Sequence, residues 1–273
     1  MNVTLNNKTV IPTIGLGTWK SSSEDAYSAV LNALEAGYRH IDTAMIYGNE
    51  EAIGKAIKDS KIKREELFIT TKLWNTDQGY ESALKAFDLS LSKLGLEYVD
   101  LYLIHWFKGY EKQMNSWKAL EDIYKSGRAK AIGVSNHNVH HIENILKNCE
   151  IKPMVNQVET HITLQNVFLH EFCESKGIKL EAYAPLMSWM IPDMLKNETM
   201  ISLAEKHSKT VPQIALRWLI QRGIVVIPKS VNKERIAQNF NIFDFELTDE
   251  DMTLVYGLNT GKKLFTDMDN VPY

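Results

Sequence analysis

The sequence predicts an α/β protein folded as a closed (β/α)8 barrel, also called a TIM barrel. Short apolar segments alternate with longer amphipathic segments eight times along the chain. Repeated βα units imply parallel strands joined by right-handed crossovers, and eight such units in 273 residues are typical of a barrel. Polar side chains also follow several of the predicted strands, at the end where barrel enzymes place their chemistry.

The eight predicted strands are too short for typical helices and are rich in Val, Ile, Leu and Tyr. They cover residues 14–17, 39–42, 67–72, 99–105, 131–135, 154–159, 179–183 and 225–227. A doubly wound open sheet is the alternative fold, but no predicted strand is followed by the G-x-G-x-x-G sequence that usually accompanies it. The barrel is therefore the favoured fold.

Helices are predicted between these strands. They cover residues 23–36, 51–58, 80–94, 111–126, 139–147, 166–176, 211–221 and 234–240. Several of them end directly before a glycine, such as Gly37, Gly95 and Gly177. Glycine readily adopts the left-handed conformation that ends many helices, so these positions mark helix stops.

Two further elements lie outside the eight units. Residues 3–5 and 9–11 flank a short polar turn and predict a β-hairpin before the barrel. Thr248 and Asp251 have the spacing of a capping box, which predicts an extra C-terminal helix reaching residue 258. No linker rich in Pro, Gly or Ser interrupts the chain, so we expect one domain over residues 1–273.

The composition is that of an ordinary globular protein. The formal charge of −3 offers no electrostatic reason to expect a nucleic-acid partner. Only two cysteines are present, and neither a signal-peptide pattern nor an apolar run long enough for a membrane span is visible. We therefore expect a cytoplasmic protein, a monomer, whose partner is a small molecule.

Polar residues gather where the predicted strands end. These residues are Asp42, Tyr47, Lys72, His105, Ser135, Asn136 and Gln157. Each has an ordinary structural explanation alone: Asp42 as a turn residue, Lys72 as a surface lysine, His105 as a buried core histidine. In a barrel, however, all of these strand ends meet at one rim, so together they predict a reaction site.

Longer motifs surround these residues. They are GLGTW (15–19), GYRHIDTA (37–44), YGNE (47–50), TKLW (71–74), LYLIHW (101–106), GVSN (133–136), NQ (156–157), AYAPL (182–186) and IPKS (227–230). In these motifs the chain resembles the aldo-keto reductase family along nearly its whole length. It is most similar to the bacterial branch that includes 2,5-diketo-gluconate and methylglyoxal reductases.

The residue chemistry suits the reduction of a carbonyl group. Hydride must come from a cofactor, because no amino acid donates it, and a side chain must protonate the oxygen. Tyr47 is a suitable acid if the ammonium of Lys72 lowers the pKa of its phenol, with Asp42 neutralising the lysine. His105 would orient the carbonyl oxygen. The resemblance implies the same four catalytic residues.

The resemblance also implies NADPH or NADP+ as the cofactor. The residues implied to bind it are Gly17, Thr18, Ser135, Asn136, Gln157, Tyr183, Pro185, Leu186, Lys229, Ser230, Val231, Asn232, Arg235 and Asn239. Among these, Ser135, Asn136 and Gln157 would hold the nicotinamide carboxamide, and Tyr183 would stack on the ring. Lys229 and Arg235 flank a predicted helix start, where charge and free backbone N–H groups suit the 2′-phosphate of NADPH.

Aromatic residues are predicted to form the substrate pocket. Beside Tyr47 and His105, the pocket residues are Trp19, Trp74 and Trp106, while Phe265 and Trp189 are weaker candidates. The sequence departs from the family at Phe107-Lys108 and at Thr160-His161-Ile162, which leaves the substrate undetermined. Small aldehydes or ketones are expected, such as methylglyoxal, diketo-gluconate-like compounds or aromatic aldehydes.

Three other hypotheses are open to test. His137, His140 and His141 lack the spacing of a metal site, so we expect no metal. A barrel lyase would use Lys72 to form a Schiff base, but it would leave the phosphate-binding segment unexplained. A non-catalytic NADPH-binding protein on the same scaffold is the remaining alternative.

Overall fold

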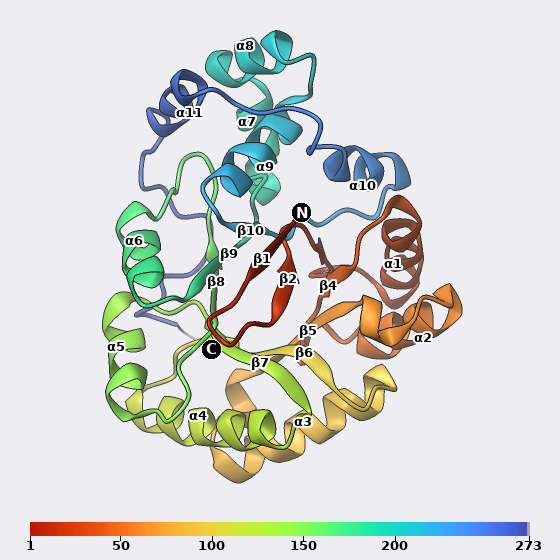
Figure 1. Ribbon diagram of the computed structural model, residues 1–273, viewed down its shortest axis with the longest axis vertical. Helices are drawn as coiled ribbons and strands as arrows, with labels where there is room; N and C mark the ends of the chain where they lie inside the picture. The colour runs from red at the N-terminus through yellow and green to blue at the C-terminus, as the bar shows by residue number, and fades with distance from the viewer. Residues whose placement is uncertain (272–273) are drawn as a thin grey trace.

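The computed structural model describes residues 1–271 and confirms the predicted barrel (Figure 1). Eight parallel strands follow one another in chain order around the sheet. They are β3 (Leu16–Gly17), β4 (His40–Asp42), β5 (Phe68–Leu73), β6 (Val99–Ile104), β7 (Ala129–Ser135), β8 (Val155–Glu159), β9 (Lys179–Tyr183) and β10 (Val225–Val226).

Parallel bridges between the first and last strands close the sheet into a ring. Ile14 pairs with Val226, and Gly17 pairs with Lys229. The backbone N–H of Gly17 donates to the carbonyl of Pro228 at 3.1 Å. A Cβ atom at position 17 would lie 2.8 Å from the carbonyl oxygen of Ile227, so this close approach requires glycine.

Helices surround the ring of strands, as predicted (Figure 1). The eight expected helices are α1 (Ser23–Ala36), α2 (Glu50–Ser60), α3 (Tyr80–Leu94), α4 (Tyr110–Lys125), α5 (Val139–Asn148), α6 (Val167–Ser175), α9 (Val211–Gln221) and α10 (Lys233–Phe240). The extra helix α11 (Asp249–Tyr256) begins with a capping box between Thr248 and Asp251. None of the helices in the described part of the chain has the length and apolar character that a membrane crossing requires.

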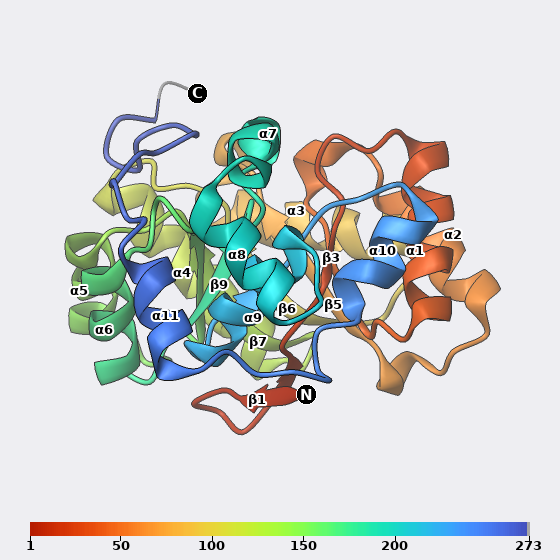
Figure 2. The same cartoon turned by 90° about the horizontal axis from the view of Figure 1, so that it is seen from above.

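The two ends of the barrel are covered differently. An antiparallel hairpin of β1 (Asn2–Thr4) and β2 (Val10–Pro12) lies across the end where the strands begin. The short helices α7 (Ile191–Leu195) and α8 (Glu198–Lys206) follow β9 and were not predicted from the sequence. Figure 2 shows α7 and the C-terminal segment (residues 257–271) at the opposite end from the hairpin. The hairpin does not cover the carboxyl ends of the strands, and the candidate site lies at those ends.

Candidate active site

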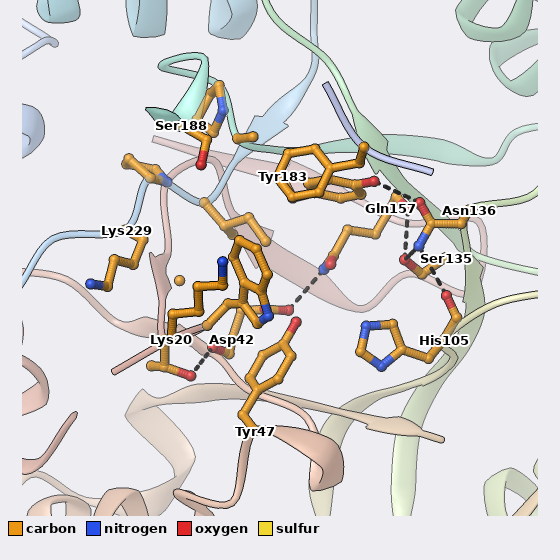
Figure 3. A pocket seen from close by; sticks show the side chains of 18 of the residues that line it. Lys20, Asp42, Tyr47, His105, Ser135, Asn136, Gln157, Tyr183, Ser188 and Lys229 are labelled. Carbon is orange, nitrogen blue, oxygen red and sulfur yellow. Dashed lines mark hydrogen bonds between the residues drawn. The ribbon is translucent and has the colours of Figure 1, made fainter. Parts of the chain in front are cut away.

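A cavity of about 730 Å³ opens at the carboxyl ends of the barrel strands (Figure 3). Fifteen of the predicted catalytic, substrate and cofactor residues line it. They are Gly17, Thr18, Trp19, Asp42, Tyr47, Trp74, His105, Trp106, Ser135, Asn136, Gln157, Tyr183, Pro185, Leu186 and Lys229. Strand ends far apart in the sequence therefore meet around one space, as expected for a barrel.

A buried ion pair lies under this cavity. Lys72 on β5 donates from Nζ to Oδ1 of Asp42 on β4 at 2.6 Å, and to the backbone carbonyl of Thr43 at 3.0 Å. The side chain of Lys72 is completely buried. Burial by itself lowers the pKa of Lys72, but the charge and hydrogen bond of Asp42, together with the charges of Tyr47 and Glu181, outweigh it, and the net shift is upward. Lys72 is therefore a fixed cation held by a fixed anion.

The hydroxyl of Tyr47 is the group that connects this pair to the cavity. Tyr47 ends the 3₁₀ turn η1 (Met45–Tyr47), and its Oη lies 3.5 Å from Nζ of Lys72. Burial raises the pKa of Tyr47 above its usual value, while Lys72 acts in the opposite direction. The expected net lowering of this pKa is therefore wrong, because the loss of water around the phenol outweighs the attraction of the ammonium.

His105 follows β6 and faces Tyr47 across the cavity (Figure 3). Its ring centroid lies 5.7 Å from that of Tyr47 and 5.1 Å from that of Trp74, both in edge-to-face arrangements. Burial, together with the positive charge of Lys72, holds the pKa of His105 well below its ordinary value. The imidazole is therefore neutral near pH 7 and carries one N–H that can donate a hydrogen bond.

Amide and hydroxyl groups line the opposite wall and bind one another. Asn136 donates to Oγ of Ser135 and to the backbone carbonyl of His105, both at 3.0 Å, and accepts from the hydroxyl of Tyr183 at 2.9 Å. Asn136 adopts a left-handed conformation (φ 58°), which asparagine tolerates better than most residues. The wall is thus fixed by its own hydrogen bonds.

The predicted phosphate-binding segment lies beside the cavity, after β10. Lys229 lines the cavity, whereas Ser230, Val231, Asn232, Arg235 and Asn239 lie beyond it. The side chain of Asn232 caps α10 by accepting the backbone N–H of Arg235 at 2.8 Å. Lys229 and Arg235 are exposed and form no ion pair with any residue of 1–271, while Lys233 pairs with Glu35 at 2.7 Å. Two unpaired cations therefore flank this helix start.

The C-terminal segment completes one wall of the cavity. Both carboxylate oxygens of Glu159, at the end of β8, accept backbone N–H groups from residues 264 and 265. This fixes Phe265 against three aromatic rings, with centroid distances of 5.5 Å to Trp19, 5.2 Å to Tyr183 and 4.9 Å to Trp189. The contact of Phe265 with the cavity agrees with its tentative assignment to the pocket.

A histidine pair on α5 holds the far end of the same segment. Nε2 of His140 and Nε2 of His141 each lie 3.2 Å from Oδ1 of Asp269, so an acidic group joins these histidines in space. The backbone N–H of Asn138 donates to Nδ1 of His141, which leaves the ring proton on Nε2. A metal ion would have to displace that proton, so the geometry favours a hydrogen-bonded anchor.

Several cavity residues were not predicted from the sequence. They are Lys20, Ile46, Ala184, Ser188, Ile191, Ile227 and Pro228. Ala184, Ile227 and Pro228 lie inside motifs that were recognised, and Lys20 directly follows one, so treating every motif residue and its next neighbour as a candidate would have found these four. Lys72 differs from the other three predicted catalytic residues because it does not line the cavity and connects to it only through Asp42 and Tyr47.

Comparison with known proteins gives a consistent result. The sequence model of the Aldo/keto reductase family matches residues 13–260. A glyoxal reductase of Bacillus subtilis (strain 168) is 50% identical over 270 residues, covering 98% of this chain and 96% of the relative. An aldo-keto reductase from a Medee basin deep-sea metagenome library superimposes with a TM-score of 0.98 at 63% identity, covering all of both chains. A Bombyx mori aldo-keto reductase in complex with NADP superimposes with a TM-score of 0.93 at 37% identity, covering 98% and 96% of the two chains.

Proposed function

The chain belongs to the aldo/keto reductase family, and we propose that it reduces a small aldehyde or ketone to an alcohol with NADPH, using Tyr47 as the proton donor. The observation that carries the proposal is the buried Lys72–Asp42 pair beside the Tyr47 hydroxyl, next to a cavity walled by aromatic rings. The glyoxal reductase relative supports a small carbonyl compound as substrate.

The proton transfer follows from the positions of three side chains. Hydride arriving at the carbonyl carbon would turn the oxygen into an alkoxide, which is a far stronger base than a phenolate. Tyr47 can therefore give up its proton even with a raised pKa, because the acceptor binds the proton more tightly. Lys72 stabilises the phenolate that remains, and Asp42 holds Lys72 in position.

His105 is proposed to orient the substrate oxygen. Its imidazole is neutral near pH 7, so it offers a single N–H and adds no charge beside Lys72. A carbonyl oxygen placed between this ring and the Tyr47 hydroxyl would receive two hydrogen bonds. Such donors stabilise negative charge as it develops on oxygen.

The residues of the opposite wall fit a nicotinamide cofactor, whose role is to supply the hydride. Gln157 lines the cavity beside Asn136 and Ser135, and the ring of Tyr183 stands over the same space (Figure 3). Gly17 and Lys229 both line the cavity, so the cavity reaches the segment that precedes α10. The two unpaired cations, Lys229 and Arg235, suit the 2′-phosphate of NADPH at the start of α10.

Geometry argues against a Schiff-base lyase. Lys72 is fully buried, does not line the cavity, and is held as a cation by Asp42, whereas an amine nucleophile must be neutral and accessible. Turnover distinguishes the proposed enzyme from a non-catalytic NADPH-binding protein. Consumption of NADPH with a panel of simple aldehydes, compared with NADH, tests the proposal directly.

Replacing Arg235 with alanine is expected to raise the Kd for NADPH roughly tenfold or more, because a charge-assisted contact to the 2′-phosphate is lost. Binding of NADH should scarcely change, since it lacks that phosphate. Fluorescence titration with both cofactors measures the effect. Lys233→Ala is the matched control, because this neighbouring lysine already pairs with Glu35. Equal affinity of the parent protein for NADPH and NADH would contradict the assignment.

Small or flat aldehydes such as glyoxal, methylglyoxal and substituted benzaldehydes are expected to give the highest kcat/KM, and steroid-sized ketones the lowest. Aromatic rings and the C-terminal segment restrict the space next to Tyr47 and His105. Phe265→Ala should raise kcat/KM for bulky ketones relative to glyoxal. Phe168→Ala, a change at an exposed ring on α6, serves as the control. A steroid that proved the best substrate of the parent would overturn this prediction.

A further inference from the structure

A second layer of titratable groups lies under the Lys72–Asp42 pair, deeper in the barrel. Glu181 on β9 precedes the cavity residue Tyr183 by two positions, and His40 on β4 precedes Asp42 by two positions. Side chains two apart on a strand point to the same face, so both residues point into the barrel. Both are completely buried, and Nε2 of His40 lies 3.6 Å from Oε1 of Glu181.

Gln157 joins this layer to the one above. Its Nε2 donates one hydrogen bond to Oδ2 of Asp42 and another to Oε2 of Glu181, both at 2.8 Å. The amide nitrogen of glutamine can donate two hydrogen bonds but cannot accept one. The two carboxyl groups together therefore fix which way the amide faces. Gln157 also lines the cavity, and its remaining polar atom, Oε1, is the one available to a cofactor carboxamide.

The charge of Glu181 is poorly compensated. Lys72 is occupied by Asp42, and burial lowers the pKa of His40 to about 3, so His40 is neutral. Within residues 1–271, Oε1 of Glu181 accepts no hydrogen bond. Burial, with the nearby charge of Asp42, raises the pKa of Glu181 from 4.5 to about 8. Thr70 and Val225 on the neighbouring strands add no charge.

Building on the proposed function, we infer that Glu181 is a positioning residue for the reduction: it fixes the Gln157 amide with the oxygen toward the cofactor, and in its protonated form it keeps the barrel interior neutral. Losing its proton would place a second negative charge beside Asp42. That charge would oppose the formation of phenolate at Tyr47, because like charges in a buried site repel strongly.

The pH dependence has a definite sign. Glu181 is neutral below pH 8 and becomes charged as the pH rises through that value, so reduction should slow over this range. The raised pKa of Tyr47 puts its own ionisation above the same range, and His40 and His105 are already neutral there. A fall in kcat near pH 8 that disappears when residue 181 cannot ionise would therefore identify this role.

Two variants of Glu181 separate charge from hydrogen bonding. Glu181→Gln can still accept from Gln157 but cannot ionise, whereas Glu181→Met removes the acceptor. The control is Glu50→Gln, since Glu50 is also buried but lies on α2, outside the barrel, where it accepts from Thr71 at 2.7 Å. The measurements are kcat for glyoxal reduction between pH 6 and pH 10 under chemistry-limited conditions, and the Kd for NADPH by fluorescence.

As the pH rises past about 8, we expect kcat of the parent and of E50Q to fall on the order of tenfold. The kcat of E181Q should stay constant over the same range. E181Q should match the parent within a few-fold at pH 6 and bind NADPH normally. E181M should bind NADPH roughly tenfold more weakly, because one N–H of Gln157 loses its partner.

An E181Q profile that superimposes on that of the parent would overturn the inference, as would an unchanged Kd for NADPH in E181M. If E181M does not fold, the isosteric E181Q still decides the matter through its pH profile. A parent protein that reduces no carbonyl compound would instead overturn the proposed function, and the Kd comparison would still test the positioning of Gln157.

Discussion

Tyr47→Phe is expected to lower kcat by about 10²–10⁴-fold while leaving the Kd for NADPH within a few-fold of the parent value. The substitution removes the hydroxyl next to Lys72 but keeps the ring, which lies edge-on to His105. In the proposed mechanism the alkoxide formed by hydride transfer is then left beside the neutral imidazole of His105 alone, which is a weaker acid than a phenol. Single-turnover rates with a simple aldehyde measure the loss without interference from product release.

Tyr110→Phe is a suitable control, because Tyr110 is exposed at the start of α4 and does not line the cavity. It should leave kcat unchanged. If Tyr47→Phe kept most of its activity while chemistry limits the rate, Tyr47 would not be the donor. His105 would then be the next residue to test, since it faces the same space.

Lys72→Met is expected to reduce kcat to a similar extent and also to destabilise the protein. Without Lys72 the phenolate of Tyr47 loses its stabilising charge, so the tyrosine becomes too weak an acid. The carboxylate of Asp42 would remain buried, and Gln157 would be its only hydrogen-bond donor among residues 1–271. Removing one partner of a buried ion pair typically costs about 3–5 kcal/mol of unfolding free energy. Denaturant unfolding and single-turnover kinetics measure the two effects separately.

The double variant provides the sharper test. In the proposed mechanism Tyr47 and Lys72 act on one proton transfer, so their losses in kcat should be far from additive. Lys206→Met is the matched control for stability, because Lys206 pairs with Asp251 but is half exposed, and exposed pairs contribute little. Fully additive losses in kcat, or a Lys72→Met protein as stable as the parent, would contradict a shared role for the buried pair.

The sequence alone determined the barrel and the position of its reaction site. Strand and helix periods are local properties of the chain, and eight alternating units allow few arrangements other than a closed parallel barrel. Asp42, Lys72 and His105 each lie within one residue of the end of a strand, and parallel strands bring those ends to one rim. The predicted site therefore follows from local patterns and one rule of topology.

The tertiary structure decided what local patterns cannot encode. Phe265 is held at the site by the contact of its backbone with Glu159, and Asp269 anchors the same segment on His141, both more than 100 residues earlier in the chain. The helices α7 and α8 lie in the connection between β9 and α9, whose short amphipathic pattern does not distinguish helix from loop.

The protonation states also depended on the tertiary structure. The raised pKa values of Tyr47 and Glu181 come mainly from the exclusion of water by side chains drawn from all around the barrel. The sequence shows which groups can ionise. The free energy of each charge, however, depends on desolvation and on neighbours that only the folded barrel brings together.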